Sequence, residues 1–350
     1  MGATMLALLK EHRASGLSLR HVPVPAVGRG DVLIKVKSSS ICGTDMHIYK
    51  WDAWAEQTVV TPNVVGHEFA GVVEAVGAEV TNVRPGDYVS AEGHVICGVC
   101  RACRSGNGHV CPHTRSFGIT IPGCFAEYAI VPATNIVHND PRLPSELACL
   151  QDPLGNAVQS VMAGDVAGKS VAVIGAGPIG LMAVAVAKAC GAGKVIAVDI
   201  NDFRLRMATR MGADSLVNSA TQPLAETLKE LTGGEGVEVL LEMSGHPDAI
   251  RQGLEGCANA GRVALLGIPA GSVELDLSRS IIFKGLRVDG ITGRRMYTTW
   301  YQVKGLLDSG RIDLAPLVTH RFRLEQYEEA FELMRSGNCG KVVFTHDDLA

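Results

Sequence analysis

The sequence predicts an α/β protein with two domains, one irregular and mostly β, the other a doubly wound parallel sheet. Its 350 residues are enough for two domains at ~150 residues each. Short alternating apolar runs fill the N-terminal part, whereas apolar runs separated by helix-like stretches fill the middle. We expect residues 1–151 and 296–350 to form the first domain and residues 152–295 to form the second.

The two ends of the chain are expected to supply the first domain. Val32, Ile34 and Val36 alternate with lysines, and residues 125–132 alternate in the same way between Gly and Pro, which is typical of half-buried strands. The C-terminal part carries two helical patterns and one strand, at 297–307, 326–334 and 342–345.

The middle of the chain alternates strand and helix, the pattern of a parallel sheet with helical crossovers. Apolar runs predict six strands, at 171–174, 195–198, 216–217, 237–241, 263–266 and 286–288. Helix-like stretches predict helices at 181–190, 202–211, 223–231 and 247–257.

Composition and charge exclude several classes of protein. The formal net charge of −4 gives no field that would attract nucleic acid or an anionic membrane. The longest uncharged run, residues 170–187, is divided by glycines and a proline, so we expect no membrane span. The N-terminus has no signal or transit features, which makes the cytoplasm the expected location. The ten cysteines are not needed as disulfide staples in a chain of this length.

A glycine-rich turn in the middle domain has the pattern of a dinucleotide site. Gly175, Gly177 and Gly180 form a G-x-G-x-x-G between the first expected strand and its helix, where they permit a tight turn and the approach of a pyrophosphate. Asp199 ends the next strand, where its carboxylate would bind the adenosine ribose and repel a 2′-phosphate, so the expected cofactor is NAD. A turn that only packs the sheet is the alternative. Arg204 fits the adenine or ribose edge and a solvated helix face equally well.

Four cysteines in one loop predict a closed zinc site. The spacing, inside a lobe expected at residues 94–113, is Cys97-x2-Cys100-x2-Cys103-x7-Cys111. Four thiolates leave no position for water, so this zinc would be structural. Disulfides or four unrelated thiols are the alternatives. The flanking Arg101 and Arg104 suggest a nucleic-acid knuckle, but the acidic net charge and the lack of interleaved aromatics argue against it.

A second group of possible metal ligands combines three chemistries. Cys42, His67 and Glu68 offer a thiolate, an imidazole and a carboxylate, the mixed set of a zinc that keeps an exchangeable position. A small core cysteine and an ordinary loop histidine explain the same residues without a metal. From the residues alone, both interpretations stay open.

The order of these motifs resembles that of the zinc-containing medium-chain alcohol dehydrogenases, over essentially the whole chain. The resemblance rests on residues 41–49, the Gly66-His67-Glu68 triplet, the four-cysteine loop, residues 123–128 and the glycine-rich turn. It implies a GroES-like, β-barrel-like catalytic domain and a Rossmann domain with a six-stranded parallel sheet. It also implies NAD and two zinc ions per chain, one catalytic and one structural.

Shorter segments are similar to those members of the family that oxidise L-threonine. They are residues 42–52, 152–158, 241–245, 266–269, 300–301 and 319–322. This implies oxidation of L-threonine by NAD to 2-amino-3-oxobutanoate, through a zinc alkoxide and hydride transfer. Such relatives read Ile-Tyr-Gly where this chain has Ile291-Thr292-Gly293. The difference weakens a side-chain role for Thr292, but not a backbone contact to nicotinamide.

The resemblance also implies catalytic roles for single residues. Cys42, His67 and Glu68 would bind the catalytic zinc, with Asp152 close to it. Thr44 would take the substrate proton through its hydroxyl and pass it by the nicotinamide ribose to His47, since an imidazole with a pKa of ~6.5 suits exchange with solvent. Asp45 would either orient His67 or cap the segment that follows it.

Nucleotide and substrate contacts are implied in the same way. The nucleotide contacts would be Gly175, Gly177, Ile179, Gly180, Asp199, Arg204, Leu266, Gly267, Ile268, Ile291 and Thr292. His94 is a candidate for substrate contact, although an ordinary loop position explains it too. Trp51 and Trp54 would be pocket walls, or else part of the lobe core or a subunit contact.

Two other functions are kept open. The chain could be a related enzyme that acts on a polyol, a butanediol or a simple alcohol, or an inactive zinc- and nucleotide-binding structural protein. The resemblance implies a homotetramer, and as pathway partner a ligase that converts 2-amino-3-oxobutanoate and CoA to glycine and acetyl-CoA. We expect no nucleic-acid or membrane partner.

Overall fold

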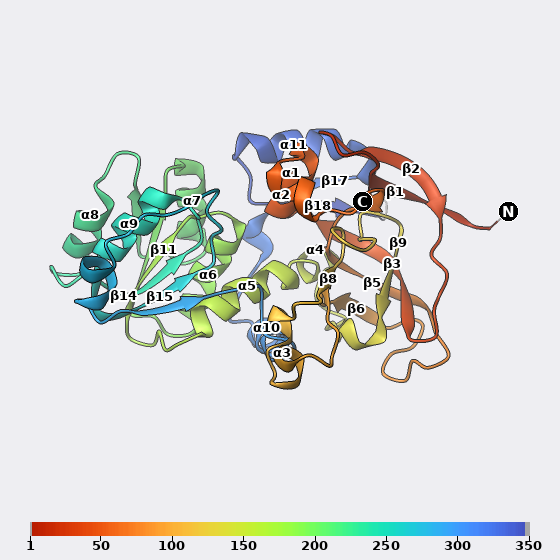
Figure 1. Ribbon diagram of the computed structural model, residues 1–350, viewed down its shortest axis with the longest axis horizontal. Helices are drawn as coiled ribbons and strands as arrows, with labels where there is room; N and C mark the ends of the chain where they lie inside the picture. The colour runs from red at the N-terminus through yellow and green to blue at the C-terminus, as the bar shows by residue number, and fades with distance from the viewer. Residues whose placement is uncertain (1, 347–350) are drawn as a thin grey trace. The chain divides into compact units, whose positions relative to one another are not determined.

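The computed structural model describes residues 2–346, which divide into two compact units (Figure 1). Residues 2–153 and 318–346 form the first unit, and residues 154–317 form the second. The segment 296–317, expected in the first domain, packs with the second unit instead. Its helix α10 (Thr298–Asp308) is bonded there, since the Thr299 hydroxyl donates to Gln159 Oε1 at 3.2 Å. The nearby Arg311 donates to the carbonyl of Ala189 at 3.3 Å.

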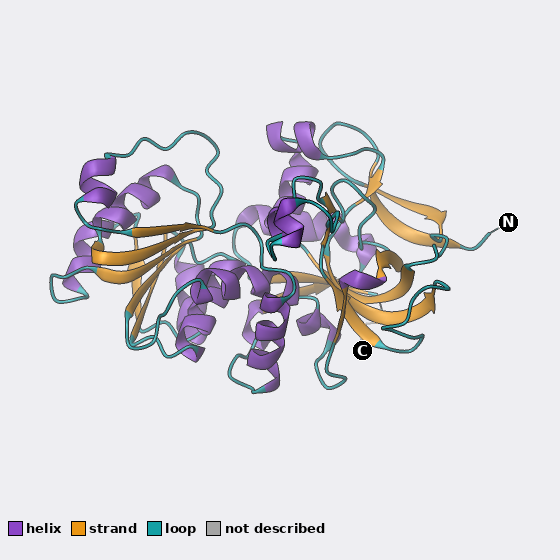
Figure 2. Ribbon diagram, turned by 60° about the horizontal axis from the view of Figure 1, so that its bottom comes forward, coloured by secondary structure: helices purple, strands orange, loops and turns teal. Residues whose placement is uncertain are grey.

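The second unit contains the doubly wound sheet that the sequence predicts. Its six strands are all parallel, in the order β13-β12-β11-β14-β15-β16. The bounds are β11 Ser170–Ile174, β12 Lys194–Asp199, β13 Ser215–Asn218, β14 Val237–Glu242, β15 Cys257–Leu265 and β16 Arg287–Gly290. Helices lie on both faces of this sheet (Figure 2), so its central strands are continuous buried apolar runs.

Helices alternate with these strands along the chain, as expected. They are α6 Pro178–Ala189, α7 Asp202–Arg210, α8 Leu224–Glu230 and α9 Pro247–Glu255. The expected helix 247–257 is two residues too long, because Cys257 is buried and pairs with Val237 as the first residue of β15.

The first unit is built on a mostly antiparallel sheet in which both ends of the chain meet. Its path is β10-β6-β5-β3-β18-β17, with β9 also paired to β3, beside the smaller sheets β2-β1-β4 and β7-β8. The bounds are β1 Thr4–Lys10, β2 Ser18–Pro23, β3 Asp31–Ser40, β4 Asn63–Val64, β5 Glu68–Val76, β6 Tyr88–Ala91, β7 His94–Val95, β8 Arg115–Ser116, β9 Tyr128–Pro132, β10 Ile136–His138, β17 Val318–Phe322 and β18 Lys341–Thr345. In this sheet Val343 of β18 is paired with Ser40 of β3.

Short helices complete the first unit. They are α1 Gly43–Lys50, α2 Ala53–Thr58, α3 Arg101–Arg104, α4 Ser145–Ala148 and α11 Tyr327–Ser336, while α5 (Gln151–Met162) begins in the first unit and ends in the second. The ring of Tyr49 stacks on Phe331 at 4.7 Å, which fixes α1 against α11. Among residues 2–346, no helix is both long and apolar enough to cross a membrane.

Candidate functional site

Cys42, His67 and Glu68 meet at one end of the seven-stranded sheet. Each offers one possible ligand atom, and the three atoms lie within 4.8 Å of one another. Strand register explains the meeting, because Ser40 of β3 is paired with Glu68 of β5 and Cys42 follows Ser40 closely. The turn before His67 requires glycine, since Gly66 has a φ of +90° and a Cβ there would lie 2.3 Å from a buried phenyl ring.

The carboxylate of Glu68 is held by a residue from the other end of the chain. It is 1% exposed, and its Oε2 accepts a hydrogen bond from the Ser40 hydroxyl and pairs with the ammonium of Lys341. Lys341 also donates to the carbonyl of Ile41 at 3.0 Å. Burial is the largest single influence and lowers the pKa of Lys341, but Glu68 and the other nearby negative groups together outweigh burial, so the pKa is raised. Sequence reasoning missed Lys341. Its only signal in the sequence is that a charged residue stands at the first position of a mostly apolar strand.

The unpaired polar atoms of this cluster belong to His67 and Asp45. His67 Nδ1 and Asp45 Oδ1 are buried, have no hydrogen-bond partner among the described residues, and lie 3.7 Å apart, too far for a hydrogen bond. The other oxygen of Asp45 accepts the N–H of Cys42 at 2.8 Å, so Asp45 caps α1. Burial raises the pKa of Asp45 to about 6. One ring nitrogen of His67 lies within 4.8 Å of the Cys42 thiol and the Glu68 carboxylate, and this trio fits the ligand set of a zinc ion.

Thr44 and His47 lie on one face of α1, three residues apart. Thr44 Oγ1 is 3.7 Å from Cys42 Sγ, so its hydroxyl is beside the ligand cluster. His47 is more than half exposed, and its Nδ1 lies 2.5 Å from Asp52 Oδ2. Asp52 is itself fixed, because its Oδ1 accepts the N–H groups that begin α2. Trp54 lies edge-on to His47, with ring centres 5.9 Å apart.

Asp152 and His94 do not belong to the group of three residues whose ligand atoms cluster. Asp152 lies in the first turn of α5 and is 7% exposed. Burial lowers the pKa of His67, but neighbouring negative groups, including Asp152, raise it well above its usual value. Asp152 is therefore near enough to His67 for its negative charge to contribute to this shift of the pKa. His94 is oriented by a fully buried carboxylate, since its Nδ1 lies 2.6 Å from Glu92 Oε1.

The four-cysteine loop is closed in a near-tetrahedral arrangement. The Sγ atoms are 3.5 Å apart for Cys100–Cys103, 3.6 Å for Cys97–Cys111, 3.8 Å for Cys100–Cys111 and 4.0 Å for Cys97–Cys103. Four Zn–S bonds of ~2.3 Å in a tetrahedron place the sulfurs ~3.8 Å apart, so the loop fits zinc. Backbone N–H groups donate to Cys111 and lower the pKa of its thiol to about 6, which favours the thiolate. All ten cysteines are free, so the disulfide alternative finds no support.

A cavity of about 450 Å³ opens at the carboxyl ends of the parallel strands of the second unit. Its lining includes Gly175, Gly177, Asp199 and Arg204 of the expected nucleotide contacts. Gly175 has a φ of +92°, and a Cβ on Gly180 would lie 1.9 Å from the carbonyl oxygen of Gly175, so the turn requires glycine at both positions. Asp199 Oδ2 accepts the N–H of Ala176 at 2.7 Å and lies 3.8 Å from Arg204 Nη1.

The remaining expected nucleotide contacts lie at the same edge of the sheet without lining this cavity. Ile179 is on α6, Leu266–Ile268 follow β15, and Ile291 and Thr292 follow β16. Ile268 is 90% exposed. Sequence reasoning missed the lining residues that follow β13 and β14, among them Ser219, Met243, Ser244 and His246. The signal that could have found them is their position directly after a strand, because the carboxyl ends of parallel strands meet at the edge of the sheet where ligands bind.

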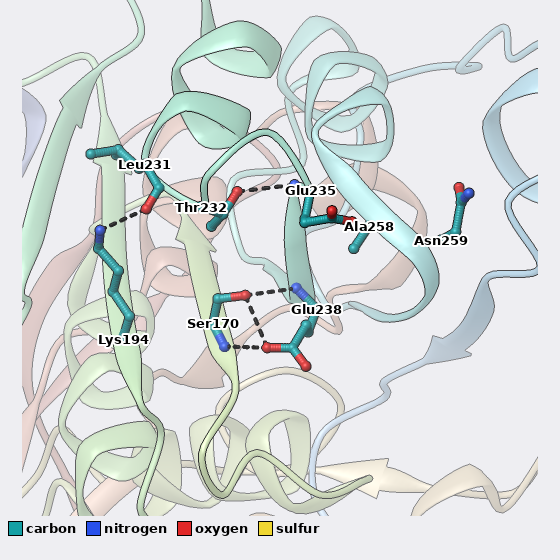
Figure 3. A pocket seen from close by; sticks show the side chains of 9 residues that line it. Ser170, Lys194, Leu231, Thr232, Glu235, Glu238, Ala258 and Asn259 are labelled. Carbon is teal, nitrogen blue, oxygen red and sulfur yellow. Dashed lines mark hydrogen bonds between the residues drawn. The ribbon is translucent and has the colours of Figure 1, made fainter.

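A second cavity, of about 460 Å³, opens at the amino ends of the same strands (Figure 3). Its polar groups bond to one another. Lys194 Nζ donates to the Leu231 carbonyl at 2.7 Å, and the N–H of Ser170 donates to Glu238 Oε2 at 2.8 Å. Ligands of open parallel sheets bind at the carboxyl ends of the strands, so this cavity is not the candidate site.

Comparisons with known proteins agree with this geometry. Residues 28–142 match the family model of the alcohol dehydrogenase GroES-like domain, and residues 178–309 match that of the zinc-binding dehydrogenases. A protein named L-threonine 3-dehydrogenase from Bacillus subtilis (strain 168) is 53% identical over 339 residues, which cover 97% of this chain and 98% of the relative. One of the same name from Pyrococcus abyssi (strain GE5 / Orsay) is 50% identical over 345 residues, 98% of this chain and 99% of the relative. The crystal structure of the alcohol dehydrogenase rspB from E. coli CFT073, complexed with NADH, has a TM-score of 0.91 and 31% identity, and the match covers 98% of this chain and 100% of that one.

Proposed function

The chain belongs to the zinc-containing medium-chain alcohol dehydrogenases, a family of oxidoreductases, and from this premise we propose that it oxidises L-threonine with NAD to 2-amino-3-oxobutanoate. The observation that carries the proposal is the cluster of Cys42, His67 and Glu68, whose donor atoms suit a zinc with an exchangeable position. L-threonine is preferred as substrate because relatives about half identical over nearly the full chain carry that activity in their names.

Cys42, His67 and Glu68 would hold the catalytic zinc. When bound, zinc acidifies the alcohol that it coordinates, which makes hydride transfer possible at neutral pH. Lys341 and Ser40 hold the carboxylate of Glu68 in place, and they would do so while the substrate exchanges. Because Glu68 is buried and Cys42 and His67 are partly buried, the charges of the cluster are screened less than they would be in water.

The substrate proton would leave along α1. Thr44 has its hydroxyl next to Cys42, and His47, on the same helix face, reaches solvent. Asp52 accepts a hydrogen bond from the Nδ1–H of neutral His47, which leaves Nε2 to take up the relayed proton. We expect His47→Asn to lower kcat and to remove the limb of the pH–rate profile due to the imidazole. An unchanged limb with an unchanged rate would refute this route.

The cavity at the carboxyl ends of the parallel strands would bind NAD. The helix α6 begins directly after Gly177 in the sequence, so its N-terminal N–H groups would donate to the pyrophosphate. The carboxylate of Asp199 would accept hydrogen bonds from the ribose hydroxyls. A 2′-phosphate would meet the negative charge of Asp199. Initial rates with NAD and NADP under equal conditions test this, and a preference for NADP would contradict it.

Substrate class and metal content need separate tests. L-threonine, sorbitol and 2,3-butanediol are offered with NAD, and NADH is followed by its absorbance, with and without a zinc chelator. We expect threonine to be fastest and the chelator to abolish turnover, whereas a fast diol beside a silent threonine would overturn the substrate. Metal analysis should give two zinc ions per chain. One zinc, retained by the four-cysteine loop, would support the structural protein instead.

The assembly and setting are further parts of the proposal. We propose a homotetramer. Strand β16 (Arg287–Gly290) supports self-association, since it is the last strand in its sheet and follows the exposed Ile282 and Phe283. The product would be consumed by a 2-amino-3-oxobutanoate CoA ligase. The ten free thiols suit a reducing compartment such as the cytoplasm. Light scattering of the purified chain tests the tetramer, and a monomer would exclude it.

A further inference from the structure

We propose that Glu242 is a positioning residue, which shapes the dinucleotide cavity by holding the loop that follows β14. The inference rests on the proposed NAD site but assigns a role to a residue that the mechanism leaves unused. Glu242 is the last residue of β14, and its side chain is fully buried. It does not line the cavity itself, whereas Met243 and Ser244, directly after it, do.

The side chain of Glu242 accepts every hydrogen bond that it makes with this loop. Its Oε1 accepts from the Ser244 N–H at 2.9 Å, from the Gly245 N–H at 3.1 Å and from the Ser244 hydroxyl. Its Oε2 accepts the Gly245 N–H as well, at 3.1 Å. Since all these partners are donors, the arrangement suits an ionised carboxylate and would not suit an amide, which would turn an N–H₂ group toward one of them.

Glu242 also holds the loop that follows β15. Its backbone carbonyl accepts the N–H groups of Leu266 at 2.9 Å and Gly267 at 3.0 Å. A Cβ on Gly267 would lie 2.6 Å from Glu242 Oε2, so that loop packs directly on the carboxylate. A Cβ on Gly245 would lie 2.6 Å from the carbonyl oxygen of Ile268. The loops that follow β14 and β15 therefore pack against each other, and both contact Glu242.

The loop that Glu242 holds touches the glycine-rich turn of the cavity. A Cβ on Gly175 would lie 2.9 Å from the Ser244 nitrogen and 3.0 Å from its Cα. Gly175 and Ser244 both line the cavity, and they come from neighbouring strands β11 and β14. A displacement of Ser244 therefore changes the cavity wall beside the turn that would hold the pyrophosphate.

The consequence is that Glu242 orders part of the cavity before the nucleotide arrives. Without the carboxylate, the N–H groups of residues 244 and 245 lose their acceptor and the loop samples other positions. The nucleotide must then order the loop when it binds, and its apparent affinity falls by the fraction of molecules with the loop in place. Groups remote from the cavity are not affected by this change.

The same strand provides a matched control. Glu238, near the amino end of β14, accepts the N–H of Ser170 at 2.8 Å and its hydroxyl at 3.2 Å (Figure 3). Glu238 therefore also bonds one serine through both its N–H and its hydroxyl, but it lies at the cavity opposite the dinucleotide site. The variants Glu242→Gln and Glu238→Gln compare the two acids, and Glu242→Asp keeps the charge on a shorter side chain.

The test is a titration of the full-length, zinc-loaded protein with NADH, followed by nucleotide fluorescence, beside thermal melts without nucleotide. We expect Glu242→Gln to raise the Kd of NADH about tenfold, or about 1.4 kcal/mol, and Glu242→Asp to raise it about threefold. Glu238→Gln should leave the Kd within twofold of wild type, even at an equal loss in Tm. In steady-state assays KM for NAD should rise in Glu242→Gln, with kcat at saturating NAD within about twofold.

Three results would overturn the inference. They are a Kd of Glu242→Gln within twofold of wild type, an equal loss of affinity in Glu238→Gln, or, if Glu242→Gln does not fold, a Kd of Glu242→Asp equal to that of wild type. Failure of the wild type to bind NADH would instead overturn the proposed function. The two failures are thus distinguishable.

Discussion

The buried ion pair between Lys341 and Glu68 predicts a large loss of stability when one charge is removed. The side chains of the pair are 2% and 1% exposed. Lys341→Met keeps most of the side-chain volume but leaves the Glu68 carboxylate, among the described residues, with the Ser40 hydroxyl as its side-chain donor. A buried charge deprived of its partner costs ~3–5 kcal/mol, so we expect this loss in the free energy of unfolding of the zinc-free protein.

Lys10 provides the matched control in the same unit. It is also fully buried, but it donates to the carbonyls of Ala14 and Gly16 and lies over the ring of Trp51 at 4.9 Å. Burial lowers the pKa of Lys10 to about 8. Lys10→Met leaves unpaired carbonyls rather than a bare charge, so its expected cost is lower, ~1–3 kcal/mol. The double variant Lys341→Met, Glu68→Gln removes both charges, and it should recover at least ~2 kcal/mol relative to Lys341→Met alone.

The assay is urea unfolding after treatment with a chelator, followed by tryptophan fluorescence and analysed by linear extrapolation. Trp51 and Trp54 lie in the first unit and Trp300 lies in the second, so the fluorescence follows the unfolding of both units. Added zinc should reduce the deficit of Lys341→Met, because a cation at the cluster compensates the carboxylate. The reasoning fails if Lys341→Met costs no more than Lys10→Met, or if the double variant is no more stable than Lys341→Met.

Three further predictions concern separate parts of the chain. Gly180→Ala should weaken NADH binding more than tenfold, since its Cβ would lie 1.9 Å from a backbone oxygen; an unchanged fluorescence titration would contradict this. Cys103→Ser should lower the zinc content from two ions to one per chain and lower the Tm, whereas two retained ions would exclude the four-cysteine site. The hydrogen bond from Arg321 lowers the pKa of Glu146 in the folded protein. The pair therefore stabilises the fold at a pH above the pKa that Glu has in the unfolded chain. This stabilisation is lost as the pH falls through the lower pKa of the folded state. Glu146→Gln should thus cost up to ~1 kcal/mol at pH 7 and flatten the acid limb of stability against pH, and an unaltered limb would count against the pair.

Local patterns predicted the parts of the protein whose residues are close together in the chain. The four cysteines, the glycine-rich turn and the strand–helix alternation each lie within a short segment, and the structure agrees with them. The expected boundary at residue 296 differs from the structure because α10 is amphipathic, and no local pattern says which unit its apolar face covers.

Long-range register decides what could not be predicted. Lys341 meets Glu68 because β18 pairs with β3 and β3 pairs with β5, over a separation of 273 residues. The side-chain partners of Glu242, Ser244 and Gly245, are local, but its carbonyl meets the N–H groups of Leu266 and Gly267 only because β14 pairs with β15. Such contacts depend on the pairing of distant strands, which periodicity in one segment does not encode.

The position of β18 has a consequence for the order of assembly during synthesis. The ribosome makes the whole second unit between β10 and β18, so the second unit can fold while the sheet of the first still lacks its partner for the end of β3. During that interval the Glu68 carboxylate has no ammonium, and Cys42 and His67 have no completed sheet behind them. A catalytic metal at this cluster would therefore be captured late in the life of each chain, whereas the four-cysteine loop could close as soon as its own short segment emerges.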